Sequence, residues 1–157
     1  MMSLWASSAL LVCGLGIAPL MLSASQALRS QRDSLALGQA VLLAQDLAHR
    51  LHLNASAATQ YQLDWGGHAS STTNTTPCHD RPCSPAEWAQ ADVTQWRAQV
   101  ALMLPDADAW LQSTGGEDAS RWLVLAWASD VVLGSAVSRL PVACPSSKRC
   151  LGWVLSP

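Results

Sequence analysis

The chain has 157 residues and a formal charge of -2 at pH 7. This charge gives no electrostatic reason to expect a nucleic-acid partner, and the length leaves room for one domain plus an anchor. The aromatic residues are eight Trp, one Tyr and no Phe. In so small a domain we expect the indole rings to serve core packing more often than stacking on a ligand.

The chain begins with an apolar segment. Residues 3–24, SLWASSALLVCGLGIAPLMLSA, form a run of 22 residues without charge. As a helix this run reaches about 33 Å, which is enough to cross a bilayer core of about 30 Å. We therefore predict that residues 1–28 are the transmembrane half of a long N-terminal helix. Pro19 removes one helical hydrogen bond, which predicts a kink near residues 15–19.

Two features of this segment disagree with a membrane anchor that holds the head outside the cytoplasm. Residues 23–25 and 25–27 are small-x-small sequences after an apolar run, so a cleaved secretory signal is an alternative, although the sequence lacks a basic n-region. Arg29 and Arg32 follow the run and nothing positive precedes it, so the positive-inside rule places the domain in the cytoplasm. The cysteine pairs described below indicate the opposite side, and we give them more weight.

Residues 29–54 are predicted to continue the helix as an amphipathic half. At about 100° per residue, small and apolar residues share one arc and polar residues lie opposite. The helix is predicted to end at Asn54, which tolerates left-handed backbone, and His49 and His52 are interpreted as solvated helix residues. The apolar arc contains Ala36, Ala40, Leu43, Ala44, Leu47, Ala48 and Leu51.

Four of the five cysteines form two close pairs in polar, Pro-bearing segments. Cys78 and Cys83 are five residues apart, and Cys144 and Cys150 are six apart, while Cys13 lies alone in the apolar run. We interpret the pairs as disulfides made in an oxidising compartment, and of the three possible pairings we choose the local one. Zinc bound by four thiols and a histidine is the alternative, but only the first pair has the usual ligand spacing.

A second helix is predicted in the middle of the chain. Residues 84–87, SPAE, combine an N-cap serine, a proline at N1 and a glutamate at N3, which is the capping-box pattern. The helix is expected to begin at Pro85 and to stop before Pro105. Asp92 is interpreted as a surface carboxylate and Trp96 as a core indole. The core-facing positions are Ala89, Val93, Trp96, Val100, Met103 and Leu104.

The remainder of the head is predicted to be a sheet. Alternating or apolar runs indicate strands at residues 61–65, 109–113, 121–127 and 151–155, with a further edge strand at 131–137. Residues 121–127 are apolar on both faces, so we expect the long helix to cover one face and loops or a partner to cover the other. Residues 55–157 are thus predicted to form one small α+β head.

No catalytic constellation is visible in the sequence. His79 beside Cys78 is a weak candidate for a thiol and its base, because adjacent loop residues rarely aim at each other. There is no P-loop, dinucleotide fingerprint or nucleophile elbow. We therefore predict a protein that is not an enzyme, with no catalytic residue, no cofactor and no metal site.

Two blocks of the sequence resemble a known family. The segment LLAQDLAHRLHLN followed by Tyr61, and the later CHDRPCSPAEWAQADVTQWRAQVALMLPDADAW, resemble the minor pilins of the type IV pilus, in particular the PilV-type pilus modification proteins. In outline the resemblance covers residues 4–127. The N-terminal motif departs from the family, because Met1 stands at the glycine of the cleavage site and Ala6 at the family's glutamate.

The resemblance implies a pilin-like fold, in which a long N-terminal helix packs on a small antiparallel sheet and a second helix lies in the connecting region. It implies a minor pilin-like subunit that acts in pilus assembly, priming or modification, anchored once in the inner membrane with its head in the periplasm. The implied partners are membrane lipid, other minor pilins or pseudopilins, and the inner-membrane assembly platform. The implied assembly helix presents Leu4, Leu10, Leu11, Val12, Leu15, Ile17, Leu20 and Leu22.

Two other functions remain open. A type II secretion pseudopilin has the same design in another assembly. A small secreted disulfide-bonded binding domain, released by signal peptidase after Ser25 or Ala27, belongs to a different class.

Overall fold

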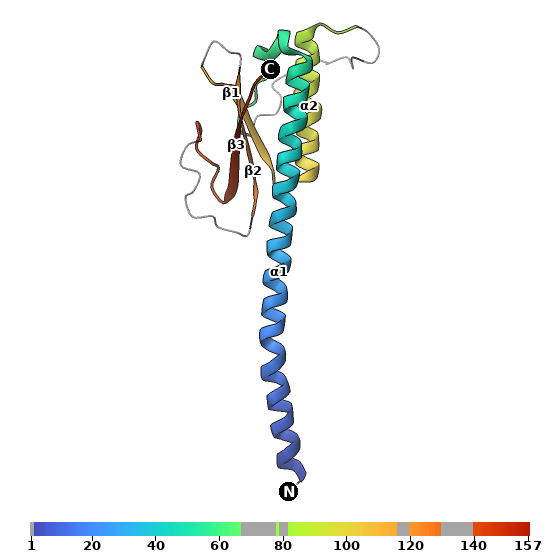
Figure 1. Ribbon diagram of the computed structural model, residues 1–157, viewed down its shortest axis with the longest axis vertical. Helices are drawn as coiled ribbons and strands as arrows, with labels where there is room; N and C mark the ends of the chain where they lie inside the picture. The colour runs from blue at the N-terminus through green and yellow to red at the C-terminus, as the bar shows by residue number, and fades with distance from the viewer. Residues whose placement is uncertain (1, 67–77, 79–81, 116–119, 130–139) are drawn as a thin grey trace. The chain divides into compact units, whose positions relative to one another are not determined.

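The computed structural model describes residues 2–66, 78, 82–115, 120–129 and 140–157, with side chains described from residue 24 onward (Figure 1). It contains two compact units, Met1–Leu35 and Ala36–Pro157, and each is considered by itself. The described residues form two α-helices, a short 3-10 helix and a three-stranded antiparallel sheet. The predicted α+β, pilin-like fold class is confirmed.

Helix α1 spans Met2–Leu53, a length of 52 residues. The eight assembly residues from Leu4 to Leu22 and most of the predicted membrane half at residues 1–28 lie where side chains are not described. Nothing tests the kink at Pro19, so all three stay predictions. Where side chains are described, no helix is both long enough and apolar enough to cross a membrane.

The part of α1 in the second unit is amphipathic, as predicted. Its buried face is made of alanine and leucine residues, so the rest of the core can pack closely against it. Leu42 lies off this face and is 60% exposed. The predicted arc is confirmed for Ala36, Ala40, Leu43, Ala44, Leu47 and Leu51, which are buried, and Ala48 is partly buried against the same core.

Helix α2 spans Pro85–Met103 and begins at the predicted capping box. The Ser84 Oγ accepts from the Glu87 backbone N–H at 3.3 Å, and the Glu87 carboxylate accepts from the Ser84 N–H at 2.8 Å. The two side chains therefore satisfy backbone donors that a helix start leaves unpaired. The prediction that Met103 faces the core is wrong, since this residue is 39% exposed. The backbone becomes extended at Leu104, and the prediction that Leu104 faces the core is confirmed by its 2% exposure.

The sheet has the strand order β1-β2-β3, formed by Asp108–Ser113, Arg121–Ala128 and Lys148–Leu155. Both pairings are antiparallel, and the register places Val124 of β2 between Trp110 and Gly152. The strands predicted at 109–113, 121–127 and 151–155 are present, but each is longer than its apolar pattern indicated, and β3 begins as early as Lys148. β2 is the central strand and is apolar on both faces, so another layer has to cover each face.

The two faces of β2 are covered by different layers, as predicted. Leu123, Leu125 and Trp127 belong to the main core, together with the buried faces of α1 and α2. Val124 and Ala126 face the other way and form a smaller cluster with Cys150. Partly buried loop and strand residues pack on that cluster, namely Trp65, Trp110, Leu140 and Val142.

The connection after α1 differs from the prediction. It forms a 3-10 helix, η1, at Ala55–Gln60, and the predicted strand at 61–65 is wrong, because only Leu63 pairs, in an isolated bridge with Leu111. The chain turns away at Gly66, whose φ of 62° favours glycine and ends the extended segment. Asn54 does not adopt left-handed backbone as predicted, since its φ is -122°. The predicted edge strand at 131–137 lies outside the described residues.

Candidate functional site

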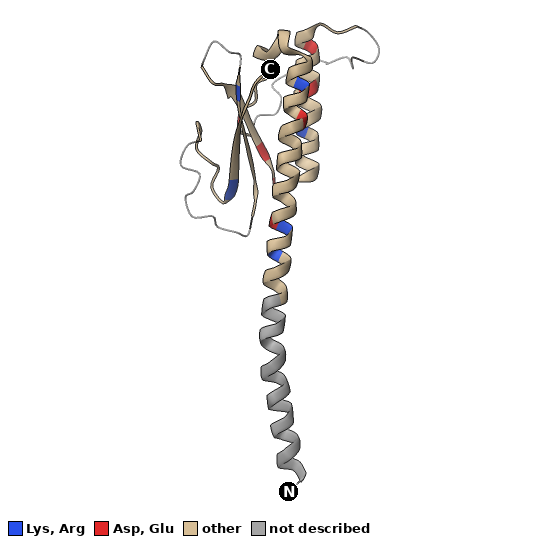
Figure 2. Cartoon of the chain, in the orientation of Figure 1, with Lys and Arg blue, Asp and Glu red and all other residues tan. Residues whose placement is uncertain are grey.

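Polar side chains connect α1 to α2 near the end of α1. The Arg50 Nε pairs with Asp46 at 2.8 Å, and its Nη1 contacts Asp92 at 3.3 Å and Gln95 at 3.1 Å. Figure 2 shows basic and acidic positions close together at this level of the two helices. The side chains of Arg50 and Asp92 are only 16% and 20% exposed. The interpretation of Asp92 as a surface carboxylate was therefore wrong.

Tyr61 completes this polar cluster from the segment after η1. Its side chain is fully buried, and its hydroxyl lies 2.7 Å from an Asp92 carboxylate oxygen and 3.3 Å from the Arg50 carbonyl. The phenol has one proton, and the shorter distance indicates that it donates to Asp92. Burial raises the pKa of Tyr61, and the hydrogen bond to Asp92 raises it further. The phenol is thus a neutral donor that fixes the carboxylate.

Two further side chains satisfy backbone carbonyls inside the second unit. The Trp96 Nε1 donates to the Leu43 carbonyl at 2.8 Å, so the predicted core indole also ties α2 to α1. The Arg121 Nε donates to the Ala58 carbonyl at 3.0 Å, and burial lowers the pKa of this guanidinium. Each contact supplies a hydrogen-bond partner for a buried polar side chain, so both side chains have a structural role.

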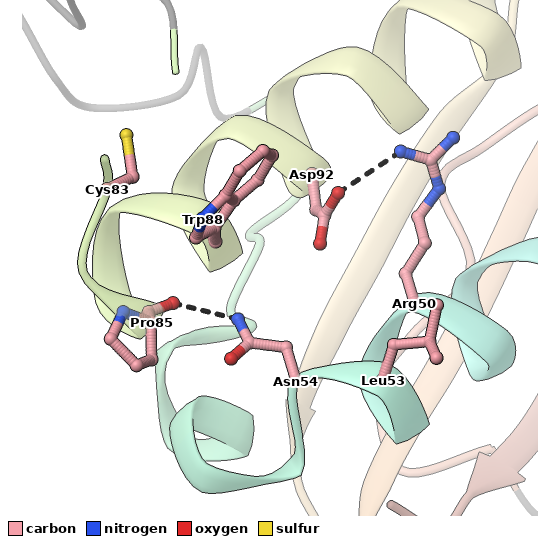
Figure 3. Close-up of a pocket in the computed structure, with 7 residues that line it drawn as sticks. All are labelled: Arg50, Leu53, Asn54, Cys83, Pro85, Trp88 and Asp92. Atoms are coloured by element: carbon pink, nitrogen blue, oxygen red, sulfur yellow. Dashed lines mark hydrogen bonds and ion pairs between the residues drawn. The ribbon is translucent and has the colours of Figure 1, made fainter. Parts of the chain in front are cut away.

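A pocket of about 380 Å³ lies beside the polar cluster (Figure 3). The end of α1 and the start of α2 line it together. The Asn54 Nδ2 donates to the Pro85 carbonyl at 2.8 Å and so holds these two ends in contact. Trp88 stands at the pocket with 47% of its surface exposed. The full lining consists of Arg50, Leu53, Asn54, Cys83, Pro85, Trp88 and Asp92.

A second hollow, of about 300 Å³, lies farther along the two helices. Its lining includes Leu42 of α1 and Leu102 and Met103 of α2, which are 60%, 86% and 39% exposed. Much of the surface of these apolar residues is not covered within the second unit. Their surface is available to another molecule.

The four head cysteines form disulfides between the local pairs, Cys78 with Cys83 and Cys144 with Cys150. Cys83 lines the first pocket, and Cys150 lies in β3. Sulfurs bonded to each other are not thiolate ligands, so the structure gives the zinc alternative no support. In the described part of the chain, no three His, Cys, Asp or Glu residues are grouped so as to hold a metal.

Part of the chain matches a known protein family. Residues 24–94 match the Tt1218-like family, described as type IV pilin Tt1218. This chain is similar to a type IV pilin. The type IV pilin-like segment runs from the middle of α1 through η1 into the first half of α2. No curated protein and no solved structure matches the chain.

The type IV pilin-like segment contains the polar cluster apart from Gln95, and the entire lining of the first pocket. The three-stranded sheet begins at Asp108 and lies beyond it. The similarity therefore concerns how the long helix joins the head, which is also where the structure concentrates its polar contacts. Pilins are structural subunits, which agrees with the prediction of a protein that is not an enzyme.

Sequence patterns did not identify Arg50, Tyr61 or Trp88 as residues of a site. One local signal was available, because Asp46 and Arg50 have the i, i+4 spacing of a helical ion pair. The other contacts join residues far apart in the chain, 42 residues for Arg50 and Asp92 and 31 for Tyr61 and Asp92. No local pattern predicts such pairs.

Proposed function

We propose that the protein is a minor pilin-like subunit of a type IV pilus, of the PilV type, that acts in pilus assembly, priming or modification. The observation that carries the proposal is the similarity of residues 24–94 to a type IV pilin. Its mechanism is lateral packing, in which the N-terminal helix joins a bundle of helices and the head sets its position. The partners are other minor pilins or pseudopilins and the inner-membrane assembly platform.

The exposed apolar residues of α1 support helix packing. Leu28 and Leu35 lie seven residues apart in the first unit and are 57% and 61% exposed. Apolar residues repeated every seven positions form a stripe that packs against another helix. Burying each leucine against a neighbour contributes about 1.5–3 kcal/mol, so a few such residues favour a bundle over isolated helices.

The location we propose is the inner membrane, crossed once, with the head in the periplasm. The uncharged run at residues 3–24 supports an anchor in lipid. The disulfides Cys78–Cys83 and Cys144–Cys150 support an oxidising compartment for the head. The periplasm is an oxidising compartment that adjoins the inner membrane, so it satisfies both features.

Site-specific photo-crosslinking in the native cell tests this function. A photoreactive amino acid replaces Leu28 or Leu35, and the exposed Ser30, on the opposite face of the same helix, is the control position. We expect both leucine positions to cross-link to other minor pilins or pilin subunits, and the control to do so more weakly. Mass spectrometry identifies the partner, and secretion-system pseudopilins would assign the chain to that assembly instead.

The intact mass of the membrane fraction gives a second measurement. A chain that retains residues 1–25 supports the anchored subunit. A chain that starts at Gln26 or Leu28, together with no cross-link at either leucine, would refute the pilin function and support a secreted domain.

A further inference from the structure

We propose that the pocket between the end of α1 and the start of α2 binds a neutral saccharide, which goes beyond a role in pilus assembly. The pocket measures about 380 Å³ and opens to solvent beside Trp88. This volume lies in the range of about 300–1,000 Å³ typical of small-ligand pockets. Its lining combines apolar surface with a few polar groups, which is the usual make-up of such sites.

The charges in the lining favour an uncharged ligand. The pocket has one basic and one acidic side chain, Arg50 and Asp92, and they contact each other at 3.3 Å. Arg50 also pairs with Asp46 outside the lining. An anion would meet Asp92 and a cation would meet Arg50, so neither finds an uncompensated opposite charge.

The same two side chains keep hydrogen-bonding capacity for hydroxyl groups. A carboxylate offers about four acceptor positions, and Asp92 uses one for Tyr61 and one for Arg50. A guanidinium has five N–H groups, and the described contacts of Arg50 go through Nε and Nη1. Acceptor and donor positions side by side suit a ligand whose hydroxyls both donate and accept.

Trp88 supplies the apolar half of the site. Trp96 and Trp127 are fully buried, but Trp88 is 47% exposed at the pocket. An indole exposes a large flat face that gains from being covered. A pyranose ring has a face of C–H groups and a rim of hydroxyls, so it can cover the indole while its rim reaches Asp92 and Arg50.

The lining is held in place before any ligand arrives. The Asn54 amide bonds to the Pro85 carbonyl (Figure 3). The capping box fixes the start of α2, and Tyr61 holds Asp92. Cys83 is joined to Cys78 just before the helix. Because these groups are already ordered, binding loses little conformational entropy.

Titration of the full chain with defined sugars tests the proposal. The chain is kept in micelles of a polyoxyethylene ether detergent, which has neither a sugar nor a charged head group. The probes are glucose, galactose, N-acetylglucosamine, lactose and cellobiose. The indole N–H signals of the eight Trp residues are followed by NMR, and Trp88→Phe assigns the signal of Trp88.

We expect at least one probe to shift the Trp88 signal saturably and to leave the signals of Trp96 and Trp127 unchanged. Trp88→Ala is expected to weaken binding about tenfold or more, with a smaller loss for Trp88→Phe. Leu102→Ala removes an exposed apolar residue of the same helix, away from the pocket, and is expected to bind like the wild type.

Three outcomes overturn the proposal. The first is that no probe shifts the Trp88 signal saturably. The second is that Trp88→Ala binds as tightly as the wild type while remaining folded by circular dichroism. The third is that choline chloride saturates the site and the sugars do not, which would assign the pocket to a cation. None of these outcomes bears on cross-linking at Leu28 or Leu35, so the two proposals fail separately.

Discussion

The hydrogen bond between Tyr61 and Asp92 is predicted to hold the end of α1, the segment after η1 and α2 together. The hydroxyl lies 2.7 Å from the carboxylate oxygen, and the ring around it is fully buried. Tyr61→Phe removes only the oxygen and keeps the ring. Asp92→Ala removes the acceptor and also the contact with Arg50 at 3.3 Å, so neither variant alone isolates the hydrogen bond.

The expected magnitude follows from the geometry. A hydrogen bond to a charged group contributes about 1.5–3 kcal/mol net. The Asp92 side chain is 20% exposed, so water replaces part of what the phenol supplied. We therefore expect a coupling free energy of about 1–2 kcal/mol between Tyr61→Phe and Asp92→Ala in a double-mutant cycle.

Urea unfolding of the full chain in detergent micelles, with its disulfides intact, measures this coupling. Near-UV circular dichroism reports loss of the packed Trp residues, and the midpoint and slope give the free energy of unfolding. The control cycle uses the exposed pair Gln112 and Asp64, whose side chains also bond at 2.8 Å. We expect the control coupling to stay below about 0.5 kcal/mol. Equal couplings in the two cycles would refute the reasoning.

Three other variants and conditions test the rest of the structure. Because burial raises the pKa of Tyr61, the only tyrosine, its phenolate absorbance is expected to appear at a pH above about 10, the ordinary pKa of a tyrosine. The stability that the neutral phenol contributes is complete below the ordinary pKa and is lost as the pH rises through the raised pKa of the folded state. A titration midpoint at the ordinary pKa would contradict this. Ser84→Ala removes the N-cap and is expected to lower the free energy of unfolding by about 1 kcal/mol, whereas the exposed Gln90→Ala on the same helix should change it by less than about 0.5 kcal/mol. Leu47→Ala, at a fully buried position, is expected to cost about 2–5 kcal/mol in urea unfolding, and a similar cost at Leu42, which is 60% exposed, would show that α1 packs on another face.

The sequence alone determined the elements whose signals are local. The capping box at residues 84–87 predicted where α2 begins, since its hydrogen bonds close within four residues. The helical period predicted the buried face of α1, and the apolar strand at 121–127 predicted a sheet covered on both sides. The close spacing of the cysteines within each pair led to the same local pairing that the structure has.

Only the tertiary structure decided how these elements meet. It brings Asp92 to Arg50 and Tyr61, leaves Met103 partly exposed although its spacing predicted a core position, and leaves Trp88 exposed beside a pocket. The Asn54 side chain bonds to Pro85, 31 residues away. Hydrogen-bond caps and periodicities act over one or two turns, so they can be read along the chain. Contacts between residues tens of positions apart depend on how the faces of helices and strands pack together. That packing depends on all the side chains of the core together, so it cannot be predicted from one segment.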